Sequence, residues 1–271
     1  MSGHEDLRKI SQKIRADVLR ATSEAGSGHP GGSLSATDIL VTLYWRVLKH
    51  DPKNPKWPER DQFILSKGHA APALYTVLAE QGYFPKAELH NLRVHGSLLQ
   101  GHPDATRTPG IEVSSGSLGN GLSIACGIAS ALRIDCSPSR VYCLLGDGEC
   151  DEGLVWEAAM FAAHHRLDNL TAIVDRNGLQ IDGPTERVVA LEPLSDKWAA
   201  FGWNVLKVSG HDHQKLQEAL EQAKCTTGKP TVIIADTVKG KGVSFMEGVV
   251  GFHGKACTSA ELDTACKELE G

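Results

Sequence analysis

Two short polar motifs, each following an apolar run, carry residue types that could bind a metal ion and an anion. Gly146-Asp147-Gly148 follows the apolar run 141–145, and Asn177 follows the apolar run 170–175. The first glycine permits a sharp turn, and the second lets the backbone approach a bulky anion. Carboxylate and amide oxygens suit Mg²⁺ or Ca²⁺, and Mg²⁺ commonly joins one or two protein carboxylates to ligand phosphates. The pattern predicts a metal–diphosphate site; the alternative is an ordinary tight turn with a solvated aspartate.

Two further segments could contribute groups at the start of a helix. The serine-rich stretch 114–117 precedes 118–132, whose small apolar residues predict a buried helix. Small residues before a helix leave backbone N–H groups free for an anion or a heterocycle, although a serine cap is an equally ordinary use. Glu152 opens the predicted helix 152–165, where an acidic side chain can act as a helix cap.

The elements that must position these motifs alternate between strands and helices. Apolar runs predict strands at 63–65, 141–145, 170–175, 204–208 and 231–236. Amphipathic or apolar segments predict helices at 5–25, 34–48, 70–81, 118–132, 152–165, 196–201, 213–225 and 258–269. Segment 86–113 reads as loops with one short helix, and the Gly- and Lys-rich segment 238–254 as a mobile loop. This alternation predicts an α/β fold with a parallel central sheet covered on both faces, formed by residues 1–271 as a single domain.

Composition excludes several other classes of protein. The chain has 271 residues and 41% hydrophobic content, enough for a large soluble core. Its formal charge of −5, without a Lys/Arg run, argues against a nucleic-acid or anionic-membrane surface. It has no apolar run long enough to span a membrane, and its charged, amphipathic first twenty residues do not form a secretory signal.

The seven cysteines indicate a reducing compartment. They are dispersed, odd in number and form no C-x-x-C pair, so a cytoplasmic location is expected. Cys126, Cys136 and Cys143 lie in or beside apolar segments, where cysteine usually packs as a small core residue. Cys150, beside the predicted metal turn, is the cysteine that we expect to be sensitive to oxidation.

The motifs together resemble the amino-terminal domain of transketolases, including the thiamine diphosphate signature of that family. The resemblance extends from the first helix to about residue 257. Besides the Gly-Asp-Gly motif and Asn177, it rests on five ordered segments: Ser27-Gly28-His29-Pro30-Gly31, Leu65-Ser66-Lys67-Gly68-His69, Gly101-His102-Pro103, Ser115-Gly116-Ser117-Leu118-Gly119 and Phe252-His253-Gly254.

The resemblance implies a thiamine diphosphate site anchored by Mg²⁺, with Ca²⁺ or Mn²⁺ as possible substitutes. The implied metal ligands are the side chains of Asp147 and Asn177 and the backbone carbonyl of Leu179. Gly148 would donate its N–H to a phosphate, and main-chain groups of Gly116 and Leu118 would contact the aminopyrimidine. Glu152 and Glu157 would belong to a carboxylate relay that links two active sites, with Glu157 counted among the cofactor-binding residues. Because they are five residues apart, they do not share one helical face and need other partners.

Four of the twelve histidines match the family pattern. His69 and His253 are expected near the diphosphate, and His29 and His102 facing the sugar hydroxyls; a solvated loop histidine is the alternative. With Glu152, we expect His29, His102 and His253 to be the catalytic groups, because neutral imidazoles both donate and accept protons. The remaining histidines are interpreted as surface or structural residues: His4, His50, His90, His95, His164, His165, His211 and His213.

The resemblance also implies a partner. A transketolase continues with a pyrimidine-binding domain and a third domain, which provide the glutamate that activates the cofactor and most sugar-phosphate contacts. We therefore expect an amino-terminal subunit, inactive alone, that pairs as α2β2 with a carboxy-terminal subunit of roughly 300 residues. The complex would transfer a two-carbon ketol unit from a ketose (phosphate) to an aldose (phosphate).

Three alternatives stay open. The chain could be a subunit of another thiamine-dependent enzyme, such as a 2-oxo acid dehydrogenase α chain or a deoxyxylulose-phosphate synthase relative. The sugar-facing histidines argue against the dehydrogenase. It could instead be a non-catalytic, cofactor-binding regulator, which would need no such histidines. A fragment of a longer chain would look similar, although the predicted closing helix favours a natural terminus.

Overall fold

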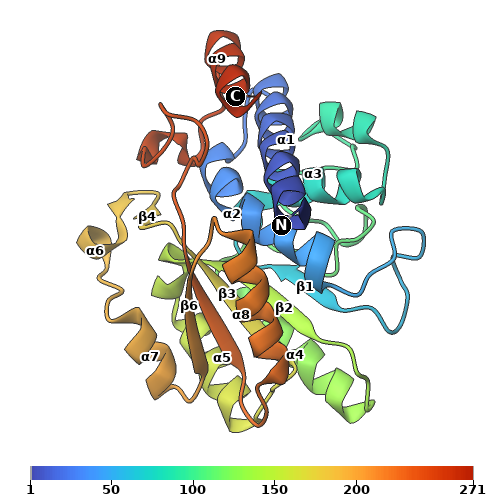
Figure 1. Ribbon diagram of the computed structural model, residues 1–271, viewed down its shortest axis with the longest axis vertical. Helices are drawn as coiled ribbons and strands as arrows, with labels where there is room; N and C mark the ends of the chain where they lie inside the picture. The colour runs from blue at the N-terminus through green and yellow to red at the C-terminus, as the bar shows by residue number, and fades with distance from the viewer. Residues whose placement is uncertain (1, 271) are drawn as a thin grey trace.

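Five strands form one parallel sheet at the centre of the molecule, which confirms the predicted fold class (Figure 1). The computed structural model describes residues 2–270, with side chains from Asp6 onward. In spatial order the strands are β1 (Gln62–Leu65), β2 (Val141–Gly146), β3 (Leu170–Arg176), β7 (Thr231–Asp236) and β6 (Asn204–Ser209). A small antiparallel hairpin of β4 (Leu179–Gln180) and β5 (Gly183–Pro184), which the sequence pattern does not predict, follows β3.

Helices cover both faces of the sheet because successive strand residues point to opposite sides. Tyr142 and Leu144 of β2 belong to one core, whereas Val141, Cys143 and Leu145 belong to the other. The first core is completed by α1 (Ser2–Glu24), α2 (Pro30–Thr42), α3 (Ala71–Gln81) and α8 (His213–Cys225). The second is completed by α4 (Asn120–Ile134), α5 (Gly153–His164) and α7 (Leu194–Ala200). The last helix α9 (Ser259–Glu270) packs against α1 and adds Ala265 and Leu269 to the first core, whereas the short α6 (Thr185–Val188) adds no residue to either core (Figure 1).

The second helix differs from its predicted bounds. It begins at Pro30, because proline is well suited to the first helical position, and it passes into a π-helix at Leu43–Val47. Glycine disfavours helices, which is why the sequence predicts a start only at Leu34. Here Gly31 is needed for close packing, since a Cβ at that position would lie 2.8 Å from the Phe252 carbonyl oxygen.

Helix α4 is buried along one side only, so the prediction of a buried helix is half correct. Leu122, Cys126 and Ala129 are buried against the sheet and α5, whereas Ile124 and Ile134 are 38% and 81% exposed. Small apolar residues occupy both sides of this helix, and composition alone therefore does not distinguish them.

Segment 238–254 packs closely against the rest of the molecule and is not the loose loop that its Gly and Lys content predicts. Val243 and Met246 are fully buried. The Gly240 N–H donates to the Gly31 carbonyl at 3.0 Å, and the segment ends in a 3₁₀ turn at Val250–His253. Its glycines serve tight packing: a Cβ at Gly240, where φ is +78°, would lie 2.4 Å from the Met246 carbonyl oxygen.

All seven cysteines are free, in agreement with a chain without disulfides. Cys126 and Cys143 are buried as predicted, but Cys136 is exposed beyond the end of α4. Cys150 is buried, and burial raises the pKa of its thiol well above the ordinary value. The expectation that Cys150 is sensitive to oxidation is therefore wrong, because a buried neutral thiol is a poor nucleophile.

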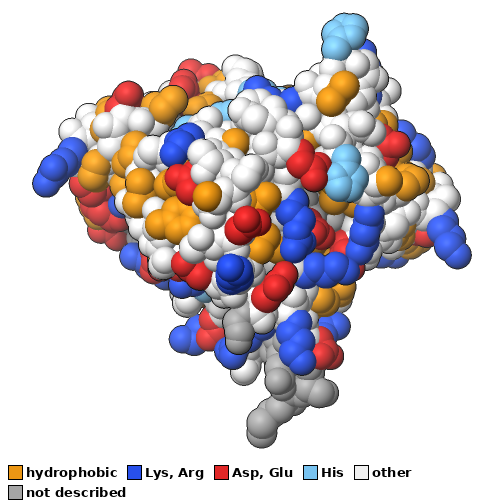
Figure 2. All heavy atoms as spheres, turned by 90° about the horizontal axis from the view of Figure 1, so that it is seen from above, with side chains coloured by type: hydrophobic (Ala, Val, Ile, Leu, Met, Phe, Trp, Pro, Cys, Tyr) orange, Lys and Arg blue, Asp and Glu red, His pale blue; other side chains and the backbone are white. Residues whose placement is uncertain are grey.

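The surface mixes charges of both signs. On the face that Figure 2 shows, Lys and Arg side chains are interspersed with Asp and Glu. Among the described residues, no helix combines the length and apolar character needed to cross a membrane.

Candidate functional site

The two predicted motifs meet at the carboxyl ends of β2 and β3. Gly146 is the last residue of β2 and lies opposite Asp175 of β3, so Asp147 and Asn177 follow neighbouring strand ends. In an open α/β sheet, ligands bind outside these ends. Asp147 is only 1% exposed, which excludes the alternative of a tight turn with a solvated aspartate.

Asp147 is held in a fixed orientation by hydrogen-bond donors. One carboxylate oxygen accepts from the Gly178 N–H at 2.6 Å and from Arg176 at 3.1 Å, and the other accepts from the Gly148 N–H at 2.8 Å. Burial, followed by the charge of Asp175, raises the pKa of Asp147. A buried carboxylate whose charge is disfavoured in this way gains from a bound cation.

The three predicted metal ligands line one cavity of about 330 Å³. Asp147, Asn177 and the Leu179 carbonyl offer one carboxylate and two neutral oxygens, a donor set that suits a hard cation such as Mg²⁺. The Lys239 ammonium already donates to the Leu179 carbonyl at 3.3 Å, so a positive charge is favourable at this oxygen. Across the described residues, no group of three or more His, Cys, Asp or Glu side chains is arranged to hold a metal. The proposed metal ligands contain a single carboxylate, so they would not form such a group.

The same cavity brings together several other predicted residues. It is lined by His69, Leu118, Gly148, Glu152 and His253. A volume near 330 Å³ lies at the lower end of the range for small-molecule sites. Gly116 is not among the lining residues; it lies against His102, because a Cβ at Gly116 would be 3.1 Å from that ring.

Four predicted histidines converge next to the cavity although they come from distant parts of the chain. His29 precedes α2, His69 lies in the 3₁₀ turn Gly68–Ala70, and His253 ends the turn after segment 238–249. Their ring centroids are 5.1 to 5.5 Å apart, and the His102 ring lies 6.2 Å from that of His29. For His29, His69 and His253 the alternative of a solvated loop histidine is therefore wrong, whereas His102 is exposed although its ring lies near that of His29.

These imidazoles are neutral near physiological pH. Burial, followed by neighbouring side-chain charges, lowers the pKa of His29 and of His253 to about 4 each. The same causes hold the pKa of His69 well below its ordinary value, and burial with Arg93 lowers that of His102. The buried Nδ1 atom of His29 has no hydrogen-bond partner among the described residues. Leaving such an atom unpaired is costly, so this nitrogen is suited to contact a ligand.

The two helix-start interpretations require correction. No serine caps α4: Gly119 occupies the cap position, and its N–H donates to the Glu149 carboxylate at 2.8 Å. Glu152 is at the cap position of α5 but its side chain makes no capping hydrogen bond, so it is free to face the cavity that it lines. Glu157 lies exposed one turn and a half further along α5 and does not line this cavity. Within this chain the structure thus does not support Glu157 as a cofactor-binding residue.

Sequence reasoning missed three buried charged residues at the site. Glu149 accepts hydrogen bonds from the Ser66 hydroxyl and from the Gly119 and Gly146 N–H groups, and it thereby joins the ends of β1, β2 and α4. In the sequence, only the position of Glu149 directly after the Gly-Asp-Gly motif indicates that it belongs to the site.

The other two missed residues are lysines. Lys67 is 1% exposed and pairs with fully buried Asp175, at the ends of β1 and β3. Lys239 lines the cavity and contacts the His253 Nδ1 atom at 2.9 Å; burial, followed by the charge of Lys67, lowers the pKa of Lys239 to about 8. A lysine directly after a short apolar strand, as in Leu65-Ser66-Lys67, is a signal that could have identified the first.

Comparison with known proteins assigns this fold to a family. The family model described as "Transketolase, thiamine diphosphate binding domain" matches residues 7–270. The transketolase of Campylobacter jejuni superimposes with a TM-score of 0.92 at 36% identity, and that of Leishmania mexicana with 0.92 at 31%. Both alignments cover 97% of this chain and about two-fifths of the solved chain (42% and 41%). The chain therefore belongs to the transketolase family.

Relatives of similar length define its place within the family. The chain is 49% identical to the 6-deoxy-6-sulfo-D-fructose transketolase subunit of Clostridium sp. (strain MSTE9), over 98% of this chain and 96% of that protein. It is 44% identical to one of the subunits of the apulose-4-phosphate transketolase of Actinobacillus succinogenes, over 98% of this chain and 97% of that protein. The prediction of an amino-terminal transketolase subunit is confirmed, and the comparisons do not favour the other thiamine-dependent enzymes or the regulator.

Proposed function

We propose that this chain binds thiamine diphosphate through Mg²⁺ and transfers two-carbon ketol units only in complex with a separate carboxy-terminal subunit. The observation that carries the proposal is the convergence of three oxygen donors, buried lysines and four neutral histidines at one edge of the sheet. Ca²⁺ or Mn²⁺ could replace Mg²⁺, because the donors are hard oxygens without strict geometric demands. When bound, thiamine diphosphate supplies the nucleophilic carbon that the protein itself lacks.

The diphosphate end of the site consists of charges and backbone donors. Asp147, Asn177 and the Leu179 carbonyl would hold the metal, and the Gly148 N–H and the Lys239 ammonium would serve the phosphates. His69 and His253 border the same end, and main-chain groups of Gly116 and Leu118 border the heterocycle.

The sugar end consists of the imidazoles. We expect His29 and His102 to face the sugar hydroxyls, and the unpaired Nδ1 atom of His29 supports such a contact. A neutral imidazole can take a proton from a hydroxyl and return it, which is what cleavage and formation of a carbon–carbon bond beside a hydroxyl require. Glu152 would serve the carboxylate relay. Glu157 is exposed and would need another chain of the assembly to join that relay.

The partner is proposed to be a carboxy-terminal subunit of roughly 300 residues in an α2β2 assembly, with residues 1–271 as one diphosphate-binding domain. The relatives named as subunits support a separate partner. Their names refer to 6-deoxy-6-sulfo-D-fructose and apulose-4-phosphate, so we propose a ketose (phosphate) as donor and an aldose (phosphate) as acceptor. Seven free thiols support a reducing, cytoplasmic location.

Native mass spectrometry of the chain, purified gently from its own cells, tests this proposal. Co-isolation of a second subunit together with thiamine diphosphate is the expected result, and the complex should extend an aldose acceptor by two carbons. The separated chain, assayed with the same sugars, cofactor and Mg²⁺, is the control and should be inactive. A solitary chain or homodimer without such a partner would contradict the two-subunit enzyme.

A further inference from the structure

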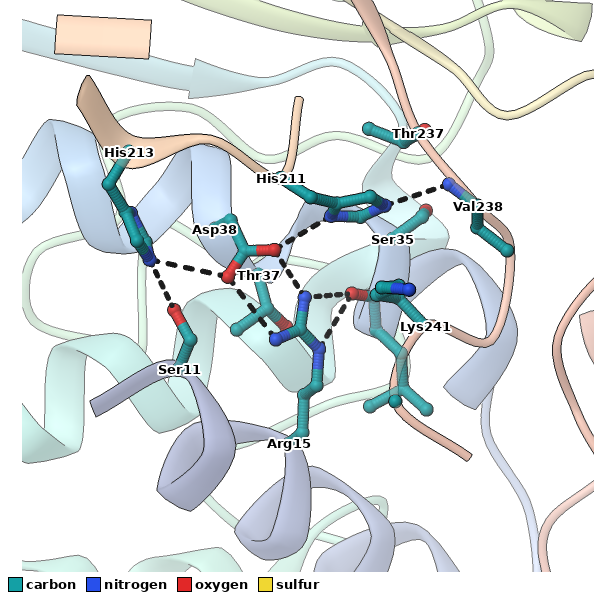
Figure 3. A network of polar contacts seen from close by, with 12 residues as sticks. Ser11, Arg15, Ser35, Thr37, Asp38, His211, His213, Thr237, Val238 and Lys241 are labelled. Atoms are coloured by element: carbon teal, nitrogen blue, oxygen red, sulfur yellow. Dashed lines mark hydrogen bonds and ion pairs between the residues drawn. The ribbon is translucent and has the colours of Figure 1, made fainter. Parts of the chain in front are cut away.

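A polar network behind the cofactor cavity contains two histidines that the sequence marks only as surface or structural. His211 lies in the loop between β6 and α8, and its Nδ1 atom is 2.7 Å from one carboxylate oxygen of Asp38 on α2 (Figure 3). Its Nε2 atom is 2.9 Å from the backbone nitrogen of Val238. A backbone N–H can only donate, so Nε2 accepts and the ring proton is on Nδ1, which donates to Asp38.

Asp38 is a rigid support for this ring. Arg15 on α1 forms a two-pronged ion pair with it, at 2.6 and 3.2 Å, and both side chains are buried. The guanidinium is fixed in turn by two hydrogen bonds to the Leu34 carbonyl. Burial opposes the charge, but Arg15 and His211 hold the pKa of Asp38 well below its ordinary value, so the carboxylate stays an acceptor.

Val238 links the Asp38–His211 pair to the cavity. It begins the segment that leaves β7, and the next residue is Lys239, whose ammonium contacts the Leu179 carbonyl and His253. Neighbouring Cα atoms are about 3.8 Å apart, so a shift of the Val238 backbone moves Lys239 with it. Segment 238–254 also carries His253, and both side chains line the cavity.

We propose that His211 is a positioning residue for the cofactor site: its Nε2 atom fixes the Val238 backbone and thereby places Lys239 and His253 for thiamine diphosphate. The identity of the ligand, thiamine diphosphate, rests on the proposed function. The hydrogen bond between His211 and the Val238 backbone does not. His213 belongs to the same network but is not the acceptor of the Val238 N–H: its Nε2 atom lies 3.5 Å from Asp38 and 3.2 Å from Ser11, and its Nδ1 atom contacts Thr42 at 2.8 Å. It therefore provides a matched comparison.

Two amide substitutions of His211 test its hydrogen bonds to Asp38 and to Val238 one at a time. The side chain of His211→Asn reaches the position of Nδ1 and can donate to Asp38, but it leaves the Val238 N–H without an acceptor. The side chain of His211→Gln reaches the position of Nε2 and can accept from Val238. His213→Gln perturbs the same network at the contacts with Thr42 and Ser11, away from Val238. Circular dichroism of each full-length variant establishes that it is folded.

Two readouts test the proposal. Hydrogen exchange of the peptide that spans Val238, without cofactor, should be at least about tenfold faster in His211→Asn and unchanged in His211→Gln and His213→Gln. The Kd for thiamine diphosphate with Mg²⁺ should rise about tenfold in His211→Asn alone.

The proposal is overturned if His211→Asn keeps wild-type exchange and affinity, if it exchanges faster at unchanged affinity, or if His213→Gln weakens binding equally. A His211→Gln variant as weak as His211→Asn would also overturn it, because the acceptor would then not be what matters. Absence of cofactor binding by the wild-type chain, both alone and with its partner subunit, would instead contradict the proposed function, and the exchange measurement would still report on the hydrogen bond between His211 and Val238.

Discussion

Replacement of Asp147 by asparagine should abolish most metal-dependent binding of thiamine diphosphate while leaving the fold intact. Of the three proposed ligands, Asp147 is the charged one, and the Asn177 and Leu179 oxygens are neutral. Loss of groups that merely orient metal ligands already costs 10–100-fold in metal affinity. Loss of the charged ligand itself should therefore cost at least about 100-fold, which is about 2.8 kcal/mol at 1.4 kcal/mol per tenfold.

The stability of the chain should change little by comparison. Asparagine has nearly the shape of aspartate and can still accept from the Gly178 N–H. Arg176 keeps its other partners, Glu186 at 2.9 Å and Glu192 at 3.2 Å. Because burial raises the pKa of Asp147, removal of its charge also relieves a cost in the metal-free protein. The free energy of unfolding should fall by less than about 1 kcal/mol.

Tryptophan fluorescence offers an assay that needs no turnover. The Trp156 Nε1 atom donates to the Cys150 carbonyl at 2.8 Å, and Cys150 lies in the 3₁₀ turn Gly148–Asp151 directly after Asp147. Titration with thiamine diphosphate, at saturating Mg²⁺ and again with chelator, should report binding at this turn. Asp182→Asn, which removes an exposed carboxylate from the β4–β5 hairpin, is the control for charge. Equal Mg²⁺-dependent affinity in wild type and Asp147→Asn would refute the metal assignment.

Three further predictions concern other parts of the molecule. His102→Ala should lower the turnover of the assembled enzyme more than its affinity for the cofactor. Steady-state kinetics and the fluorescence titration measure the two quantities. A larger loss of affinity than of turnover would assign His102 to the cofactor site and not to the sugar. Asp38→Asn leaves buried Arg15 unpaired and should lower the free energy of unfolding by about 3 kcal/mol at pH 7. Because the pKa of Asp38 is depressed in the folded state, its stabilisation is complete above about pH 4 and declines as the pH falls below that value, so urea unfolding should show the deficit shrinking there. Exposed Cys136 should react with a thiol reagent in the folded chain and buried Cys150 only after unfolding; early labelling of Cys150, detected by peptide mass mapping, would contradict its burial.

The elements could be predicted from the sequence because their signals are local. The strand 231–236 is an apolar run of a length typical of buried parallel strands, and its predicted bounds agree with β7. Helix 213–225 is amphipathic and begins after Asp212, whose carboxylate accepts from the Gln214 and Lys215 N–H groups. The strand order has no such local signal, since the placement of β7 between β3 and β6 depends on packing across the whole sheet.

The site could be predicted only where residue type and loop position coincide. Asp147 and Asn177 lie directly after apolar strands, so their meeting at one sheet edge follows from parallel pairing. Lys67 and Glu149 carry charges that surface residues usually carry, and nothing in a single sequence states that they are buried. The sequence does not reveal the role of His211 either, because no local signal marks its contact. That role depends on Val238, which approaches His211 only because β6 and β7 are neighbours.

Burial keeps the histidines of the site neutral, and the lysines at the site add to this effect. Lys67 contributes to the depressed pKa of His69, and Lys239 to that of His253, each after burial itself. The same positive charges suit a diphosphate, which the metal alone does not fully neutralise. The two buried ammonium groups therefore favour the anion and, after burial of the rings themselves, help to keep the neighbouring imidazoles neutral. Proton exchange with a sugar requires that neutral state, so the binding and the chemistry proposed here depend on a single electrostatic arrangement.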